Sequence, residues 1–240
     1  SAASDVYKRQ DNDSLSGAEA LIRWNSKKYG FTGPNTFIPL LEDSALIIPL
    51  GRWIINTAAK ACNRWITSIP DFVMHINLSF VQIVKSNIVK DVLENIERYS
   101  AANNHYVFEI TETIEMDQIP AVQNVFKEFV KNDFRFAIDD FGTGYSNYGY
   151  MRDRTFDIVK VDRSFVTDID KLKDNYLMVS FIIKMAHEMG LHVCIEGVET
   201  KEELSCVKKL GADYIQGYYY GKPVCLQDFE EQHLKRFVLG

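Results

Sequence analysis

The chain has 240 residues, of which 46% are hydrophobic and 12% aromatic, and this apolar content excludes a disordered chain or a coiled coil. The 27 basic and 33 acidic side chains give a net charge of −6, which argues against a surface that holds nucleic acid by bulk charge. With this net charge, any phosphate that the protein handles must be met by local cations. No stretch approaches the roughly 18 consecutive apolar residues of a membrane span.

Seven short apolar runs alternate with longer segments of helical period along the chain. The runs predict strands at 18–24, 72–77, 105–110, 134–140, 156–161, 191–196 and 212–216. The segments between them predict helices that include 50–67, 88–99, 122–131, 175–189 and 202–210. This βα repeat indicates one α/β domain with a parallel sheet, and seven strands in about 200 residues favour a modified (β/α)8 TIM-like barrel. A doubly wound sheet is disfavoured because no Gly-x-Gly-x-x-Gly turn is present.

Each predicted strand splits into a bulky apolar face and a second face that ends in a polar residue. The second faces end at Asn77, Glu109, Asp139, Lys160, Glu196 and Gln216, and Glu19, Leu21 and Arg23 share one face of the first strand. Asp162 follows Lys160 in the same phase. In a βα barrel such residues converge on the mouth where active sites lie. The competing interpretation is a set of solvated strand-end polar groups or internal salt bridges.

The polar residues of this mouth offer oxygen ligands. Asp140 adds a carboxylate directly after Asp139, where the chain leaves its strand and can turn back. Oxygen-only sets favour Mg²⁺ or Mn²⁺ over zinc. Two such ions can activate a water and clamp a phosphoryl group, and they would reverse the negative sign of the site toward an anionic substrate.

Three histidines, His75, His105 and His192, occupy inward positions low on their strands. They lie two or more residues below the mouth, so we expect a buried structural role for them rather than catalysis. The four cysteines form no close pair of the zinc or redox type, and no secretory leader opens the chain. A cytoplasmic location is therefore expected.

Six segments of the chain carry recognisable motifs. They are Glu19-Ala20-Leu21 with Arg23-Trp24, Asn77-Leu78-Ser79, Glu109-Ile110-Thr111-Glu112, Asp139-Asp140-Phe141-Gly142-Thr143-Gly144-Tyr145-Ser146, Lys160-Val161-Asp162 and Glu196-Gly197-Val198-Glu199. Together they resemble the EAL-domain family, in order and at family spacing, from Gly17 to about Pro223. The resemblance implies a modified (β/α)8 barrel that hydrolyses the bacterial second messenger cyclic di-GMP to the linear dinucleotide pGpG.

The resemblance also implies a role for each site residue. Glu19, Asn77, Glu109 and Asp139 would bind the first metal, and Asp139 and Asp140 the second, with Glu196 close to it or bound to it. Lys160 would contact the attacking water, and Glu196 would act as general base. Arg23 would hold a substrate phosphate, with Leu21 and Asp162 also on the substrate side and Gln216 at the rim near the second ion. Glu112 would brace the loop 141–146.

Cofactors and partners follow from the same resemblance. Two Mg²⁺ or Mn²⁺ ions are expected in each site, and Ca²⁺ is expected to inhibit because it prefers more ligands at longer distances. The expected partner is cyclic di-GMP, not DNA or RNA; a homodimer and regulatory domains in a longer chain are further expectations. The main alternative is a catalytically silent cyclic di-GMP receptor, against which the complete motifs speak. A sugar-phosphate isomerase or aldolase barrel would not need so many oxygen ligands.

The opening segment departs from the family pattern. Family members begin with an aromatic-rich strand that ends in Gln-Pro, whereas residues 1–10 read SAASDVYKRQ. We therefore interpret residues 1–13 as a non-native or truncated leader and residues 14–240 as the barrel domain. Seven predicted strands are one short of a closed barrel, which predicts an open sheet edge beside the Glu19 strand unless Val6 and Tyr7 fill the gap.

Overall fold

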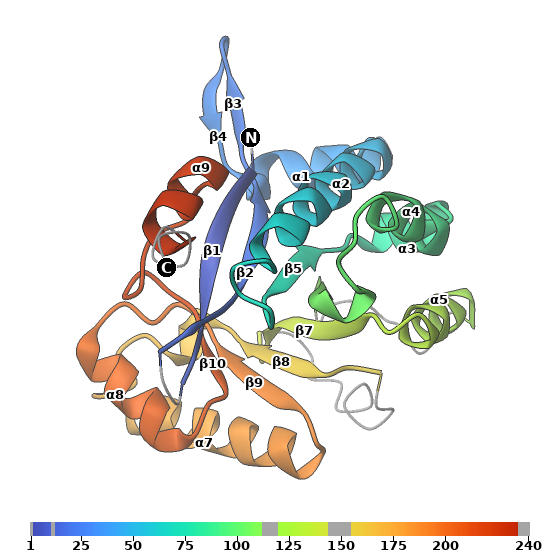
Figure 1. The fold of residues 1–240 in the computed structure, drawn as a ribbon. Coiled ribbons are helices and arrows are strands. Elements are labelled where there is room, and N and C mark those ends of the chain that lie inside the picture. The colour runs from blue at the N-terminus through green and yellow to red at the C-terminus, as the bar shows by residue number, and fades with distance from the viewer. Residues whose placement is uncertain (1, 11–12, 112–119, 144–154, 235–240) are drawn as a thin grey trace.

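The computed structural model describes residues 2–10, 13–111, 120–143 and 155–234, and its centre is a closed barrel of eight strands (Figure 1). The barrel strands are β1 (Ala2–Arg9), β2 (Leu15–Ile22), β5 (Val73–Asn77), β6 (Tyr106–Thr111), β7 (Arg135–Phe141), β8 (Ile158–Val161), β9 (His192–Ile195) and β10 (Tyr214–Ile215). Neighbours from β2 round to β10 pair in parallel. The α/β barrel predicted from the sequence is confirmed.

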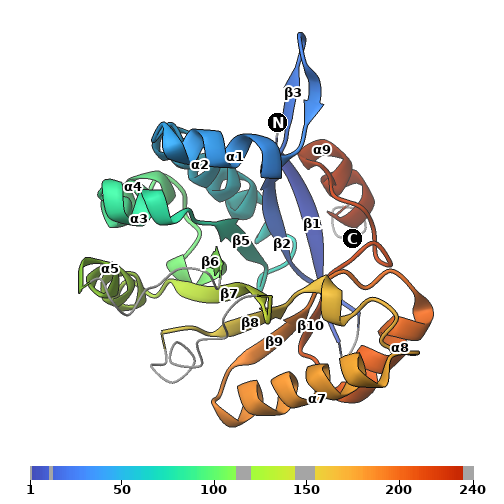
Figure 2. The same cartoon turned by 180° about the vertical axis from the view of Figure 1, so that it is seen from behind.

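Helices cover the outside of this barrel, as both faces of the molecule show (Figures 1 and 2). They are α1 (Pro34–Asp43), α2 (Ile47–Trp65), α3 (Phe80–Lys85), α4 (Ile88–Ile96), α5 (Pro120–Lys131), α7 (Lys173–Glu188), α8 (Lys201–Leu210) and α9 (Leu226–Phe229). Short 3-10 turns lie at Asn103–His105 and Arg163–Phe165, and a π-helical turn lies at Glu230–Leu234. The five predicted helices correspond to α2, α4, α5, α7 and α8.

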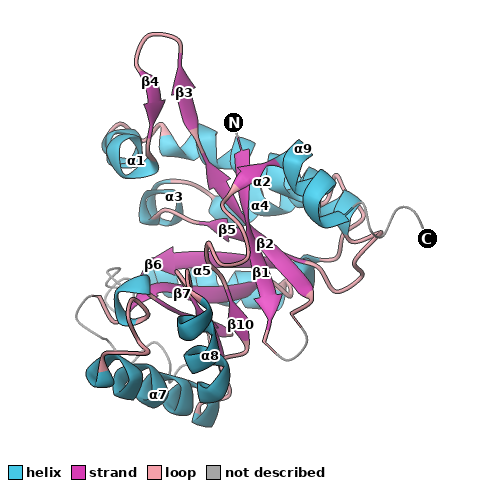
Figure 3. Ribbon diagram, turned by 90° about the vertical axis from the view of Figure 1, so that its left-hand side faces the viewer, coloured by secondary structure: helices cyan, strands magenta, loops and turns pink. Residues whose placement is uncertain are grey.

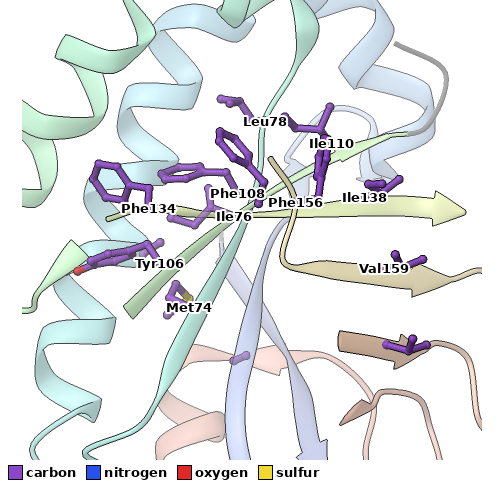
Figure 4. Packing of buried hydrophobic residues seen from close by; sticks show 14 of the residues in the cluster. Met74, Ile76, Leu78, Tyr106, Phe108, Ile110, Phe134, Ile138, Phe156 and Val159 are labelled. Carbon is purple, nitrogen blue, oxygen red and sulfur yellow. The ribbon is translucent and has the colours of Figure 1, made fainter. Parts of the chain in front are cut away.

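The bulky face of each strand packs against these helices. Phe108 and Ile76 point into this outer layer and are fully buried, and neighbouring strands and loops add Phe134 and Phe156 (Figure 4). Phe108 meets Phe129 of α5 edge-on, with ring centroids 5.0 Å apart. Removing such a ring costs about 3–5 kcal/mol. The outer layer thus fixes the strand phase that turns the opposite side chains into the barrel.

Strand β1 closes the barrel. It runs antiparallel to β2 from Ala2 to Lys8 and pairs with β10 at Lys8 and Arg9. Val6 and Tyr7 are each 1% exposed. Within the described part of the chain, no open sheet edge lies beside the Glu19 strand, because residues 2–9 fill the eighth position. This is the alternative that the sequence left open, in which Val6 and Tyr7 fill the gap. The interpretation of residues 1–13 as a non-native leader stays a prediction.

A two-stranded ribbon of β3 (Trp24–Ser26) and β4 (Gly30–Thr32) projects from the body of the molecule (Figure 3). Its aromatic side chains Trp24, Tyr29 and Phe31 are exposed. A short strand, β11 (Val224–Cys225), pairs antiparallel with β1. Among the described residues, no helix combines the length and the apolarity that crossing a membrane requires.

Candidate active site

The carboxyl ends of the parallel strands bring the predicted polar residues together around one ammonium group. Lys160 of β8 is 1% exposed. Its Nζ lies 2.7 Å from Glu109 Oε2, 2.8 Å from Glu196 Oε1 and 2.9 Å from Asp139 Oδ1. Glu19 Oε2 is 3.5 Å from the same nitrogen. Residues from five different strands or strand ends therefore meet, as the strand phase predicted.

Asp139 and Asp140 reach the same cavity although they are consecutive in the chain. Alternation along a strand would send them to opposite faces. Between Ile138 and Phe141, however, the register of β7 against β8 shifts by an irregularity, and Asp140 has φ of 55°. Aspartate tolerates this left-handed conformation better than most residues. The local bulge thus turns the second carboxylate back toward the first, a common use of bulges beside active sites.

Glu19 is held by two amide groups. Asn77 Nδ2 donates to Glu19 Oε1 at 2.6 Å, and Gln216 Nε2 donates to Glu19 Oε2 at 2.9 Å and to Asp5 Oδ2 at 3.0 Å. The amide oxygen of Asn77 is then the atom that it can offer to a cation. Gln216 is buried against Glu19 and Asp5, deeper than the rim position expected for it from the sequence.

Glu109 is bonded from two sides. Its Oε2 faces Lys160, while Oε1 accepts a hydrogen bond from Tyr7 Oη at 2.8 Å and lies 2.8 Å from His75 Nδ1. Burial, and then the charge of Lys160, lowers the pKa of His75 well below its ordinary value, so the imidazole is neutral. His75 is buried, as expected, and it also contacts the site residue Glu109 directly. Sequence reasoning missed this contact.

The site carries excess negative charge. Burial by itself would lower the pKa of Lys160, but the surrounding carboxylates, Asp139 first, raise it well above its ordinary value. Burial and the charge of Asp139 raise the pKa of Glu196 to about 8 despite the nearby ammonium. Burial and the same aspartate raise the pKa of Asp140 to about 6. One lysine faces five carboxyl groups, and the raised pKa values mean that a bound cation would favour the ionised forms of Glu196 and Asp140.

This donor set fits divalent cations. Ligand atoms of Asp139, Asp140 and Glu196 all lie within 4.8 Å of one another. Glu19 and Glu109 supply further carboxylate oxygens beside Lys160, and Asn77, which is bonded to Glu19, supplies an amide oxygen. Oxygen ligands and surplus negative charge favour hard cations such as Mg²⁺ or Mn²⁺. An acidic cluster that could bind such a cation is therefore present, and the division of ligands between two cations stays a prediction.

A cavity of about 970 Å³ borders part of this cluster. Its polar side is formed by Glu19, Asn77, Asp139, Asp140 and Arg23, and its apolar side by Leu21, Pro34, Ile38, Pro39 and Phe80 among others. Arg23 Nη1 donates to the carbonyl oxygen of Ile22 at 2.9 Å, which holds the guanidinium at the end of β2. Charged groups, carboxylate and amide oxygens and an apolar wall occur together in a space of ligand size.

The remaining predicted site residues lie at the edge of this cluster or outside the described residues. Asp162 accepts a hydrogen bond from Ser164 N at 2.9 Å and caps a 3-10 turn, and its charge contributes to the raised pKa of Asp140. Glu112 and the end of the loop 141–146 lie outside the described residues.

A supporting residue that sequence reasoning missed is Glu203, at the start of α8. Its Oε2 accepts hydrogen bonds from the backbone N–H groups of Glu199 and Thr200, at 2.9 and 3.0 Å, and Oε1 accepts from Asp168 N at 3.1 Å. These bonds hold the chain just after Glu196. The Thr-x-x-Glu spacing from Thr200 to Glu203 is the capping-box signature. The sequence therefore contained a pattern from which the role of Glu203 at this helix start could have been predicted.

The comparisons with known proteins agree with this geometry. The sequence model described as EAL domain matches residues 7–223. The cyclic di-GMP phosphodiesterase PdeL of Escherichia coli is 32% identical over 213 residues, which cover 88% of this chain and 58% of PdeL. Three further curated relatives are covered over 33% or less of their length.

Two solved structures have nearly the same fold. The EAL enzyme Bd1971, with cAMP and cyclic di-GMP bound, superposes with a TM-score of 0.91 and 34% identity, over 96% of this chain and 64% of that one. The PaMucR phosphodiesterase in complex with c-di-GMP gives a TM-score of 0.89 and 28% identity, over 95% of this chain and 93% of that one.

Proposed function

Because the chain belongs to the EAL domain family, we propose that it hydrolyses cyclic di-GMP to linear pGpG with the aid of two divalent cations. The observation that carries the proposal is the buried Lys160 ammonium, which has Glu109, Asp139 and Glu196 within 2.9 Å. Of these, Asp139 also lines a cavity together with Arg23. The relative PdeL is a cyclic di-GMP phosphodiesterase, and the structure of Bd1971 has cAMP and cyclic di-GMP bound, which supports this substrate.

The proposed division of ligands follows the contacts. Glu19, Asn77, Glu109 and Asp139 would hold one ion, and Asp139, Asp140 and Glu196 the other, so that Asp139 is shared. When bound, Mg²⁺ or Mn²⁺ supplies Lewis acidity that offsets the phosphodiester charge and makes a nearby water more acidic. Ca²⁺ should inhibit because its longer, looser coordination does not clamp an in-line displacement.

In the proposed reaction, the side chains of this chain position the phosphodiester and move one proton. The Arg23 guanidinium binds a non-bridging phosphate oxygen. Glu196 accepts a proton from water as the water oxygen attacks phosphorus, the P–O3′ bond breaks, and the 3′ oxygen leaves and regains a proton as a hydroxyl. Lys160 holds positive charge beside the attacked phosphorus. Leu21 and the apolar wall contact a guanine base, and Asp162 and Gln216 border the substrate side.

The test is direct. The purified chain is incubated with cyclic di-GMP and Mg²⁺, and the products are separated by liquid chromatography. We expect pGpG, no product with EDTA, and falling turnover when Ca²⁺ is added at constant Mg²⁺. Binding of cyclic di-GMP without pGpG would instead support the silent receptor, and stimulation by Ca²⁺ would contradict the ligand geometry. Sedimentation of the same sample would test the homodimer that we also propose.

A further inference from the structure

His75 occupies an unusual place inside the barrel. It is 3% exposed and lies on the inward face of β5, two residues below Asn77. The hydrophobic cluster inside the barrel contains Tyr7, Val107, Ala137, Ile158 and Cys194, with Val73 and Tyr214 packed against it. Most strands thus place apolar or small side chains in the interior beneath the mouth, whereas β5 places an imidazole there.

The contact of His75 is with a single carboxylate oxygen. Its Nδ1 lies 2.8 Å from Glu109 Oε1, and Glu109 Oε2 lies 2.7 Å from Lys160 Nζ. As a cation ligand Glu109 is ionised and only accepts hydrogen bonds, so in that state the bond places the proton on Nδ1. The two oxygens of Glu109 therefore have different partners, one below the mouth and one within it.

The imidazole ring is itself fixed. It stacks on Tyr7 with ring centroids 4.0 Å apart and an interplanar angle of 14°. Tyr7 Oη also donates to Glu109 Oε1 at 2.8 Å. A group whose own rotamer is locked by packing can hold a carboxylate at a defined torsion, which a mobile side chain cannot do.

We propose that His75 is a positioning residue for Glu109: its Nδ1–H holds one carboxylate oxygen so that the other faces the cation site beside Lys160. The inference rests on the proposed function only in taking Glu109 as a cation ligand. Hydrogen-bonding partners of metal ligands orient the ligands, and their loss typically weakens metal binding 10- to 100-fold. The side chains at the barrel mouth, and not His75, take part in the reaction itself.

The test compares two replacements of similar size in the full 240-residue chain. His75→Asn keeps an N–H donor close to the position of Nδ1, whereas His75→Leu removes it. The primary readout is Mn²⁺ binding by titration calorimetry without nucleotide, and melting curves report folding. We expect His75→Leu to bind Mn²⁺ at least about tenfold more weakly and His75→Asn to remain within about threefold of the wild type. Tyr7 still donates to the same oxygen, so the loss should lie at the lower end of the range.

A matched control separates positioning from packing. Ile158→Val alters another buried interior residue that is 3% exposed and belongs to the same interior cluster. It should lower the melting temperature slightly and leave Mn²⁺ affinity unchanged. In hydrolysis assays, excess Mn²⁺ should restore much of the activity of His75→Leu, because the defect lies in ligand orientation.

Specific results would overturn the inference. Unchanged Mn²⁺ affinity in a folded His75→Leu variant would do so, and so would equal losses in the Leu and Asn variants. A wild-type chain that binds no Mn²⁺ would also remove its basis. By contrast, a wild type that binds Mn²⁺ but yields no pGpG would contradict the proposed function, while the comparison of the His75 variants would still decide the positioning role.

Discussion

At the scale of single residues, Asp139 has the most demanding position, since the proposed ligand sets share it. Its Oδ1 lies 2.9 Å from Lys160, and its ligand atoms lie close to those of Asp140 and Glu196. We expect Asp139→Asn to weaken Mn²⁺ binding more than about tenfold and to abolish turnover, because an amide lacks the charge that holds two cations. Calorimetry and pGpG assays measure both, with exposed Asp170→Asn as control. Normal activity would contradict the two-cation account.

Glu196 should separate binding from chemistry. The neutral isostere Glu196→Gln keeps shape and loses basicity, so cyclic di-GMP affinity should stay near the wild-type value while hydrolysis falls at least about a hundredfold. Equilibrium binding and single-turnover assays on the same preparation decide this. Exposed Glu188→Gln should change neither. A collapse of cyclic di-GMP binding would show that Glu196 acts mainly as a cation ligand.

At the scale of secondary-structure elements, the start of α8 supports the chain beyond Glu196. Burial by itself would raise the pKa of Glu203, but backbone N–H groups of Glu199, Thr200 and Asp168 lower it below its ordinary value. Glu203→Ala should therefore destabilise the protein by about 1–3 kcal/mol, since buried donors lose their acceptor. Thermal melts should show roughly 2–4 °C loss per kcal/mol. Exposed Glu202→Ala in the same turn should have little effect.

The same bonds predict the direction of a pH effect. Because the folded-state pKa of Glu203 lies below its unfolded value, its contribution to stability is complete above the unfolded pKa. It is lost as pH falls through the folded pKa. The gap in melting temperature between the wild type and Glu203→Ala should consequently narrow in acid. A gap that widens there would contradict the assignment.

The sequence predicted most of the long, buried elements correctly and missed several short or proline-containing ones. Parallel strands such as β6 and β7 are buried on both faces and end in polar residues, so their phase placed Glu109 and Asp139 correctly. The ribbon β3–β4 and helices α1 and α3 were not predicted, because short elements and a helix that contains Pro34 and Pro39 carry weak periodicity. The contact of His75 with Glu109 depends on cross-strand register, which no pattern within one strand reveals.

At the scale of the whole molecule, barrel closure depends on β1. Strand pairing with β2 and β10 leaves Val6 and Tyr7 buried, but Asp5 places a further carboxylate beside Gln216 and near Glu19. Burial raises the pKa of Asp5, which means that the ionised carboxylate is disfavoured at this position. We propose that residues 1–13 are not the native first strand.

A chimera tests this proposal. If residues 1–13 are not the native first strand, exchange of these residues for the corresponding first-strand segment of PdeL should raise both the melting temperature and the turnover. The measurements are thermal unfolding and pGpG production at matched protein concentration. Equal values in the two proteins would show that the present β1 already completes the barrel without cost.

The direction of β1 decides where any preceding polypeptide meets the domain. Because β1 runs against its neighbours, Ala2 pairs with Ile22, one residue before Arg23, and not with the opposite end of the barrel. The returning strand β11 pairs with Ala3 and Ser4 beside it. An upstream sensor joined to this chain would thus act on the rim that holds Arg23, the residue that we propose binds a substrate phosphate. A displacement at the start of β1 would then reach Arg23 across a single pair of strands, β1 and β2.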